Sequence, residues 1–186
     1  WADKIIGTIF SSVTGRTAGF SIIDFGEVKD VTKSTYSGLM FIGGAAGSVA
    51  GGIKVGTFAV LMAAVISSLR GRPHAEAFGR EIHQSQLHRA LTVAVLGLAF
   101  IVVSATVLTT LEPDVPFLDI IFDTVSAFGT TGASTGILPD TGLSSKILFM
   151  VLMYVGRLGP VALALALATE DDTEVYRFAQ ESVKIG

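Results

Sequence analysis

An uninterrupted apolar segment, residues 90–111, constrains this chain more than any other feature. The segment holds no charged residue, and at about 1.5 Å rise per residue a helix of this length crosses the ~30 Å hydrocarbon core of a bilayer. Half of all residues are hydrophobic and only 16% are charged, a balance too apolar for a soluble domain of this length. The sequence therefore predicts a membrane protein in which residues 90–111 form a transmembrane helix.

Two further apolar stretches extend this pattern. Residues 144–168 are interrupted only by Lys146 at one end and Arg157 in the middle, which predicts a second transmembrane helix. Residues 36–69 are too long for one simple helix and carry a glycine cluster near their centre, which predicts a broken helix.

Two shorter segments, residues 1–21 and 117–134, begin as apolar, helix-like runs and change abruptly to Thr and Gly. Each is too short to cross the membrane twice and too apolar for an ordinary loop. Irregular backbone at membrane depth is tolerated only where it is buried in protein or faces water, so both segments are predicted to be re-entrant hairpins. Because the chain begins inside such a segment without an initiator Met, we expect a fragment of a longer protein.

The distribution of charge predicts the orientation. Residues 70–89 hold four arginines against two glutamates, whereas residues 112–123 hold four acids and no base. The excess of arginine predicts that loop 70–89 faces the cytoplasm and that the tail, residues 169–186, does so two crossings later. The histidines of this loop, His74, His83 and His88, match no common metal-ligand spacing and are expected to be solvated.

Composition also argues against several functional classes. The absence of cysteine removes disulfides and thiolate metal sites. The net charge is only -3, and the basic residues form no stripe with interleaved aromatics, which argues against nucleic acid as a partner. The sequence shows neither a Ser/His/Asp grouping nor a carboxylate pair suited to catalysis, so we do not expect an enzyme.

The two hairpins are related by an internal repeat, and aligning the two copies requires a one-residue gap. The matching positions are Phe10, Val13, Thr14 and Thr17-Ala18-Gly19 in the first copy, and Phe122, Val125, Ser126 and Thr130-Thr131-Gly132 in the second. A polar stretch and a predicted spanning helix follow each copy. The repeat unit is therefore a re-entrant hairpin followed by a helix, as expected where a pore is assembled by repetition around an axis.

The T-x-G motifs are candidate ion sites, because rings of backbone carbonyls can replace the hydration shell of K⁺ without fixed charge. A carbonyl aimed at a pore axis can require backbone angles closed to residues with a Cβ, which suits glycine at the third position. A turn in a Gly-rich protein is the alternative for either copy, but two equivalent copies favour the ion site. The candidate residues are Thr17, Ala18, Gly19 and Phe20, and Thr130, Thr131, Gly132 and Ala133.

Four stretches resemble the Trk/Ktr/HKT potassium transporter superfamily: SVTGRTAGF at 12–20, LMFIGGAAGSVAGGIKV at 39–55, SAFGTTGASTG at 126–136 and GRLGP at 156–160. The sequence FGREI at 78–82 and the C-terminal end resemble the Ktr-type membrane subunit in particular. The resemblance implies an all-α membrane protein whose helix, re-entrant pore loop and helix repeats form a pseudo-fourfold, K⁺ channel-like pore. Residues 1–69 would be the end of the third repeat, 70–89 a cytoplasmic loop, 90–168 the fourth repeat and 169–186 the cytoplasmic tail.

The resemblance also implies a gate beneath the filter, formed by a flexible intramembrane loop. Its residues are Gly43, Gly44, Ala45, Ala46, Gly47, Ser48, Val49, Ala50, Gly51 and Gly52. Independently, each glycine costs ~1 kcal/mol relative to Ala inside a helix, so this cluster disfavours a stiff helix. Close helix packing through Gly43 and Gly47, spaced four apart, is the alternative. A phosphate-binding loop fits poorly, because Ile53 separates Gly52 from Lys54 and no Ser or Thr follows the lysine.

Arg157 is the one charge in the middle of the last predicted span, where an arginine costs ~2.5 to 3.5 kcal/mol on insertion scales. The resemblance places it beside the gate loop, where its donors could bind loop carbonyls and its charge could oppose a passing cation. Snorkelling to the cytoplasmic surface is the alternative. Lys54 is either an analogous residue or an anchor at a helix end.

Together these features predict the pore-forming subunit of a potassium uptake transporter in the bacterial cell membrane. The resemblance implies a homodimer of membrane subunits on a cytosolic nucleotide-binding regulatory ring, with K⁺ as the transported ion, no organic cofactor and Na⁺ as an activator in many relatives. Two alternatives remain open. One is a solute carrier whose broken helix binds a small anion or amino acid at the midplane, and the other is a membrane fragment that conducts nothing by itself.

Overall fold

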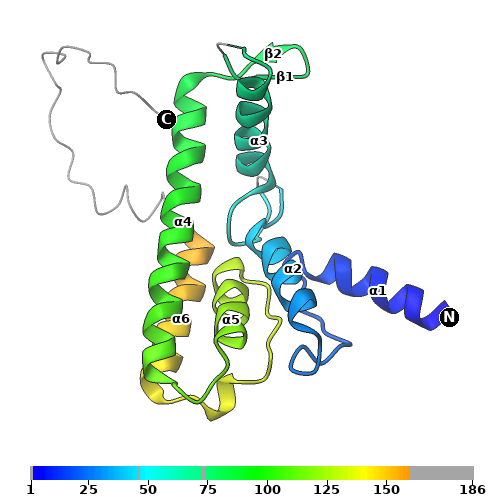
Figure 1. Ribbon diagram of the computed structural model, residues 1–186, viewed down its shortest axis with the longest axis vertical. Coiled ribbons are helices and arrows are strands. Elements are labelled where there is room, and N and C mark those ends of the chain that lie inside the picture. The colour runs from blue at the N-terminus through cyan, green and yellow to red at the C-terminus, as the bar shows by residue number, and fades with distance from the viewer. Residues whose placement is uncertain (1, 46, 73, 160–186) are drawn as a thin grey trace, which may run out of the picture.

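The computed structural model describes residues 2–45, 47–72 and 74–159, and these residues are mostly helical, as predicted. The elements in chain order are α1 (Ala2–Thr14), α2 (Asp30–Phe41), α3 (Val55–Leu69), β1 (Glu76–Ala77), β2 (Arg80–Glu81), α4 (Gln84–Leu111), α5 (Phe117–Gly129), the 3₁₀ turn η1 (Leu138–Asp140) and α6 (Leu143–Leu158). Helix α4 runs along most of the molecule, with α3 beside one half and α5 and α6 beside the other (Figure 1).

Helix α4 begins earlier than the predicted span, at Gln84 rather than at residue 90. The added residues are mostly polar and are compatible with a helix, so an apolar pattern alone does not detect them. Among the described residues, α4 is the helix that is long and apolar enough to cross a bilayer. Helix α6 is described up to Leu158, and the predicted continuation of this span to residue 168 lies outside the described residues.

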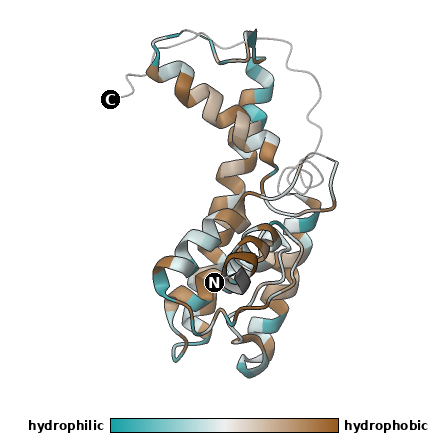
Figure 2. Cartoon of the chain, turned by 90° about the vertical axis from the view of Figure 1, so that its right-hand side faces the viewer, coloured by the Kyte–Doolittle hydropathy of each residue, from teal (hydrophilic) through white to brown (hydrophobic). Residues whose placement is uncertain are grey.

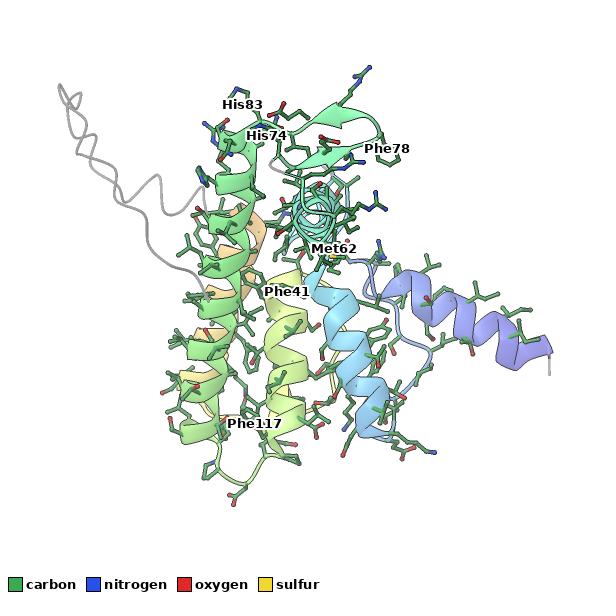
Figure 3. The ribbon with its side chains drawn as sticks, turned by 45° about the horizontal axis from the view of Figure 1, so that its top comes forward. Phe41, Met62, His74, Phe78, His83 and Phe117 are labelled. Carbon is green, nitrogen blue, oxygen red and sulfur yellow. The ribbon has the colours of Figure 1, made fainter. Side chains whose placement is uncertain are left out.

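Helix α5 lies at the centre of the core, where it packs against α2, α4 and α6. Every residue from 122 to 129 is buried. The rings of Phe25, Tyr36 and Phe122 pack together, with centroids 4.7 to 6.0 Å apart. Phe41 lies where the end of α2 meets the end of α5, and Phe117 lies at the opposite end of α5 (Figure 3). Burial of one such side chain contributes about 1.5 to 3 kcal/mol to stability, and α5 buries several of them. Helix α5 is therefore a firmly held support for the segment that follows it.

The predicted broken helix is two helices, α2 and α3, and the described residues between them, 42–45 and 47–54, are not helical. Helix α2 starts at Asp30, six positions before the apolar stretch begins. The two ends of the connecting loop are held together, since Ile42 and Ile53 form a parallel bridge. The Gly43 N–H donates to the Ile53 carbonyl at 2.7 Å, and the Val55 N–H donates to the Gly44 carbonyl at 3.1 Å.

A two-stranded hairpin, β1 and β2, lies within residues 70–89, which were predicted to be a loop in an all-α protein. Its turn contains Phe78 and Gly79, both with positive φ (51° and 75°). Phe78 lies at the tip, with His74 and His83 toward the base (Figure 3). Hydrophilic residues gather at this end of the molecule and at the opposite end, with hydrophobic helices between them (Figure 2).

Helix α1 projects away from the other helices (Figure 1). Its apolar side chains Ile5, Ile6, Ile9 and Val13 are exposed. The C-terminal half of α1 is attached to α2 by a hydrogen bond of 2.9 Å, in which the buried Tyr36 hydroxyl donates to the Ser11 carbonyl. The end of α1, and with it the first T-x-G motif, is therefore attached to α2.

Candidate ion pathway

The two T-x-G motifs meet at their glycines, although they come from opposite ends of the described chain. A Cβ added to Gly132 would lie 3.4 Å from Gly19 Cα. A Cβ added to Gly19 would lie 2.7 Å from the carbonyl oxygen of Thr131 and 3.8 Å from Gly132 Cα. The absence of a side chain at Gly19 is therefore what allows the two backbone segments to approach, whereas a Cβ at Gly132 would meet Gly19 at an ordinary contact distance.

The two motifs share an unusual backbone conformation. Among the described residues, three residues other than glycine have positive φ, and two of them are Thr17 (69°) and Thr130 (52°). The glycine two positions later also has positive φ in each copy, 76° at Gly19 and 87° at Gly132. A β-branched residue rarely adopts this region, and such strain, of order 1 to 3 kcal/mol, concentrates at functional sites. A change of backbone handedness at alternate residues can turn successive carbonyls toward one side.

A helix C-terminus precedes each motif. At the end of α5, the Thr130 N–H donates to the Ala127 carbonyl (3.1 Å) and the Thr131 N–H to the Ser126 carbonyl (2.9 Å), the bonding pattern of a Schellman cap. At the end of α1, the Ala18 N–H donates to the Thr14 carbonyl (3.1 Å). Helix C-termini carry a partial negative charge, so both motifs lie where a cation is favoured and an anion is not.

The buried end of the glycine-rich loop lies directly against the second motif. The Gly51 N–H donates to Thr130 Oγ1 at 2.8 Å, and the Gly52 N–H donates to the Gly156 carbonyl of α6 at 3.2 Å. In the middle of the loop, residues 45 and 47–49 are exposed, with Val49 75% exposed. Because no residue from 42 to 54 among those described is helical, the arrangement does not support the alternative of helix packing through Gly43 and Gly47.

Three glycines make this arrangement possible because they have no side chain. A Cβ on Gly156 would lie 1.9 Å from the Phe128 carbonyl oxygen, which brings α6 against the end of α5. A Cβ on Gly51 would lie 2.6 Å from Thr130 Cγ2, and one on Gly43 would lie 2.1 Å from the Gly51 carbonyl oxygen. These distances leave no space for a side chain between the loop, the second T-x-G motif and α6.

Lys54, rather than Arg157, contacts the loop carbonyls. The Lys54 ammonium donates to the Ser48 carbonyl at 3.1 Å and to the Ala50 carbonyl. Arg157 is exposed and makes no hydrogen bond or ion pair with the residues that the structure describes. The expected hydrogen bonds from Arg157 to the loop are therefore not found in this part of the chain, although Arg157 directly follows Gly156, which accepts the bond from Gly52.

The sequence did not single out Asp123, which is 3% exposed on α5. Its Oδ2 accepts a hydrogen bond from Ser134 Oγ at 2.8 Å. Its Oδ1 accepts from the Thr135 N–H at 2.8 Å and from Thr135 Oγ1 at 3.3 Å. The signal was available, because an ionisable residue inside an apolar membrane segment requires a partner.

Two further polar contacts join the helices near the predicted outer side. Lys33 Nζ of α2 lies 2.5 Å from Asp119 Oδ1 of α5, and both side chains are largely buried. Glu112 Oε1, at the end of α4, accepts hydrogen bonds from Ser145 Oγ and the Gly142 N–H, both at 2.7 Å. These two bonds lower the pKa of Glu112 and place a carboxylate at the N-terminus of α6, where negative charge is favoured.

Two short helices, α1 and α5, end in T-x-G motifs, and α5 packs among α2, α4 and α6 with the glycine-rich loop against its C-terminal end. This mostly helical arrangement around an apolar spanning helix is that of a membrane protein. A family model described as TrkH, cation transport protein, matches residues 1–176. The chain belongs to this family of membrane cation transport proteins, which are transporters and not enzymes. The family assignment made from the sequence motifs is thus confirmed.

The chain is 38% identical over 173 residues to the Ktr system potassium uptake protein B of Bacillus subtilis, covering 93% of this chain and 39% of that protein. It is 36% identical over 191 residues to the potassium/sodium uptake protein NtpJ of Enterococcus hirae, covering 100% of this chain and 42% of that protein. The chain thus spans about two fifths of the length of these relatives.

A solved structure supports the fold. The crystal structure of the potassium transporter TrkH from Vibrio parahaemolyticus matches with a TM-score of 0.77. The match covers 90% of this chain and 38% of the solved chain, at 21% sequence identity.

Proposed function

We propose that this chain is part of the pore-forming subunit of a potassium uptake transporter in the bacterial cell membrane. In this proposal, K⁺ crosses between the backbone carbonyls of residues 17–20 and 130–133. The observation that carries the proposal is the meeting of the two T-x-G motifs at Gly19 and Gly132, each with the same positive φ pattern. Carbonyl rings without fixed charge suit K⁺, which must lose its hydration shell at low cost.

The direction of the helices favours a cation pore over a midplane solute carrier. Carriers of anionic solutes direct the N-termini of broken helices at the substrate. Here the two short helices, α1 and α5, direct their C-termini at the motifs. The partial charge at that end attracts a cation.

The proposed gate is the loop of residues 43–52, in a closed position beneath the filter. Its support is the bond from the Gly51 N–H to the Thr130 hydroxyl, together with the Lys54 ammonium that holds the Ser48 and Ala50 carbonyls. Arg157 follows the contact at Gly156 and would add a positive charge close to the ion path. Shortening residues 45–51 should therefore raise K⁺ flux in the full-length protein.

The wider organisation is also a proposal and rests on the resemblance. The filter motifs have an open flank, since Ala18, Phe20 and Gly132 are exposed. A groove of about 400 Å³ runs beside the second motif, and two further repeats would complete the pore there. The resemblance adds a homodimer on a cytosolic nucleotide-binding ring, activation by Na⁺, and a cytoplasmic position for loop 70–89 and the tail, 169–186.

Ion flux into proteoliposomes that contain the full-length protein tests the proposed function. We expect saturable uptake of Rb⁺ or K⁺ that competing Na⁺ inhibits weakly. Empty liposomes and liposomes with an unrelated membrane protein are the controls. Uptake that small anions or amino acids block, without cation flux, would instead indicate a solute carrier.

A further inference from the structure

We propose that Asp123 is a positioning residue that sets the K⁺ over Na⁺ selectivity of the pore by holding the segment that leaves the second T-x-G motif. This inference rests on the proposed function. Asp123 itself lines no ion site in the proposal; it acts through Ser134 and Thr135, the two residues that directly follow Ala133.

The first step of the argument is that α5 holds the motif at both of its ends. Before the glycine, the N–H groups of Thr130 and Thr131 donate to carbonyls in the last turn of α5. After the glycine, Ser134 and Thr135 donate three hydrogen bonds to the Asp123 carboxylate of the same helix. One rigid helix therefore fixes the span of the segment that contains Gly132 and Ala133.

The second step is that this attachment is strong. Hydrogen bonds to a carboxylate are roughly twice as strong as those between neutral groups. Asp123 is 3% exposed, so water competes little for its oxygens. Helix α5 is itself packed against three other helices, so the carboxylate cannot follow a movement of the segment. Contraction of the carbonyls around the smaller Na⁺ would have to stretch these bonds.

The third step is that the first repeat lacks this carboxylate. Ser11 occupies the position in α1 that corresponds to Asp123 in α5, and its hydroxyl donates to the Gly7 carbonyl of its own helix at 2.8 Å. There, Thr14 Oγ1 donates to the Phe20 carbonyl at 2.8 Å instead. Selectivity should therefore depend on Asp123 far more than on Ser11, which provides a matched control.

A second role for the charge must be separated from positioning, because a carboxylate near a pore mouth also attracts cations through space. Loss of that attraction would weaken the apparent affinity for K⁺ and Na⁺ together and would depend on ionic strength. Loss of positioning would change the ratio of the two affinities. Neutral substitutions of the partners, Ser134→Ala with Thr135→Val, remove two of the three bonds and leave the charge in place.

The experiment measures Rb⁺ uptake by full-length protein in proteoliposomes, with Na⁺ as competitor and with the amount of inserted protein determined. We compare Asp123→Asn with the double variant Ser134→Ala/Thr135→Val. The controls are Ser11→Ala, the matching position of the first repeat, and Asp140→Asn, an exposed acid in the same segment. We expect both test variants to lose about tenfold in K⁺ over Na⁺ discrimination, which corresponds to about 1.4 kcal/mol, with the maximal rate per inserted protein within about twofold of wild type.

The outcomes decide between the explanations. If Asp123→Asn inserts into the membrane and keeps the wild-type discrimination between K⁺ and Na⁺, the inference is overturned. It is also overturned if Asp123→Asn and Asp140→Asn show the same change in discrimination while the neutral double variant shows none. If Asp123→Asn does not insert, the neutral double variant alone decides by the same criterion. Absence of cation flux in the wild-type protein is a different result, because it would overturn the proposed function first.

Discussion

Alanine at the two glycines of the proposed filter, Gly19 and Gly132, should have unequal effects, and Gly19→Ala should be the more damaging change. Both positions have positive φ, where a Cβ costs about 1 to 2 kcal/mol in backbone strain. At Gly132 the added Cβ meets Gly19 Cα at 3.4 Å, an ordinary contact distance. At Gly19 it would lie 2.7 Å from the carbonyl oxygen of Thr131, which cannot be accommodated without movement.

The magnitude follows from these distances. To restore ordinary contact with a Cβ at Gly19, the Thr131 oxygen must move by roughly half an ångström, and overpacking of this kind costs about 1 to 3 kcal/mol. Together with the strain, the total at Gly19 is about 2 to 5 kcal/mol, against about 1 to 2 kcal/mol at Gly132. A carbonyl displacement of this size exceeds the difference in radius between K⁺ and Na⁺, so discrimination should be lost before conduction.

Rb⁺ uptake with increasing Na⁺, in full-length protein of equal membrane insertion, measures the effect. The matched control is Gly79→Ala in the hairpin, where φ is 75° and no atom lies within 4 Å of the added Cβ. This control carries the same strain without the collision. Selectivity equal to wild type in both filter variants, or a larger loss in Gly132→Ala than in Gly19→Ala, would refute the reasoning.

Three further predictions concern charged residues. Lys54→Gln removes the ammonium donor to the loop, worth about 1 to 2 kcal/mol, so basal Rb⁺ flux should rise by about 5- to 30-fold; unchanged flux would mean that backbone bonds alone hold the loop. Arg157→Gln should also raise flux, but without lowering the melting temperature in detergent, and the opposite pattern would indicate a structural role. Lys33→Met should lower the free energy of unfolding by about 3 kcal/mol because Asp119 stays buried without its partner. Lys33→Met combined with Asp119→Leu should recover most of that loss, and a double variant as unstable as the single one would contradict this account.

The features that could be predicted from the sequence are those with a local signal. Uncharged apolar length predicted the helix that ends at Leu111, and clustered glycines predicted the break between α2 and α3. Helix ends were less accurate, because polar residues such as those from Gln84 onward extend a helix without changing its apolar pattern. The hairpin was missed because Phe78 at positive φ is not a residue that turn statistics favour.

Contacts between distant residues could not be predicted, because they depend on how the helices pack. The sequence shows that Asp123 and Lys33 need partners in a membrane, but not that these are Ser134 and Asp119. The pairing of Lys54 with the loop is different, since its acceptor Ala50 is only four residues away. For the contact with the loop carbonyls, the resemblance directed attention to Arg157. The short sequence separation between Lys54 and the loop would have favoured the lysine.

The attachment of the loop also indicates how the proposed gate and the proposed filter would influence one another. Two bonds hold the buried end of the loop, from the Gly51 N–H to the Thr130 hydroxyl and from the Gly52 N–H to the Gly156 carbonyl. At about 0.5 to 1.5 kcal/mol each, breaking both costs about 1 to 3 kcal/mol, a range that the differential binding of a regulator can supply. Because Thr130 belongs to the second T-x-G motif, release of Gly51 would free a hydroxyl at the end of the proposed filter. In the proposed mechanism, opening of the loop would therefore change the surroundings of the filter in the same step.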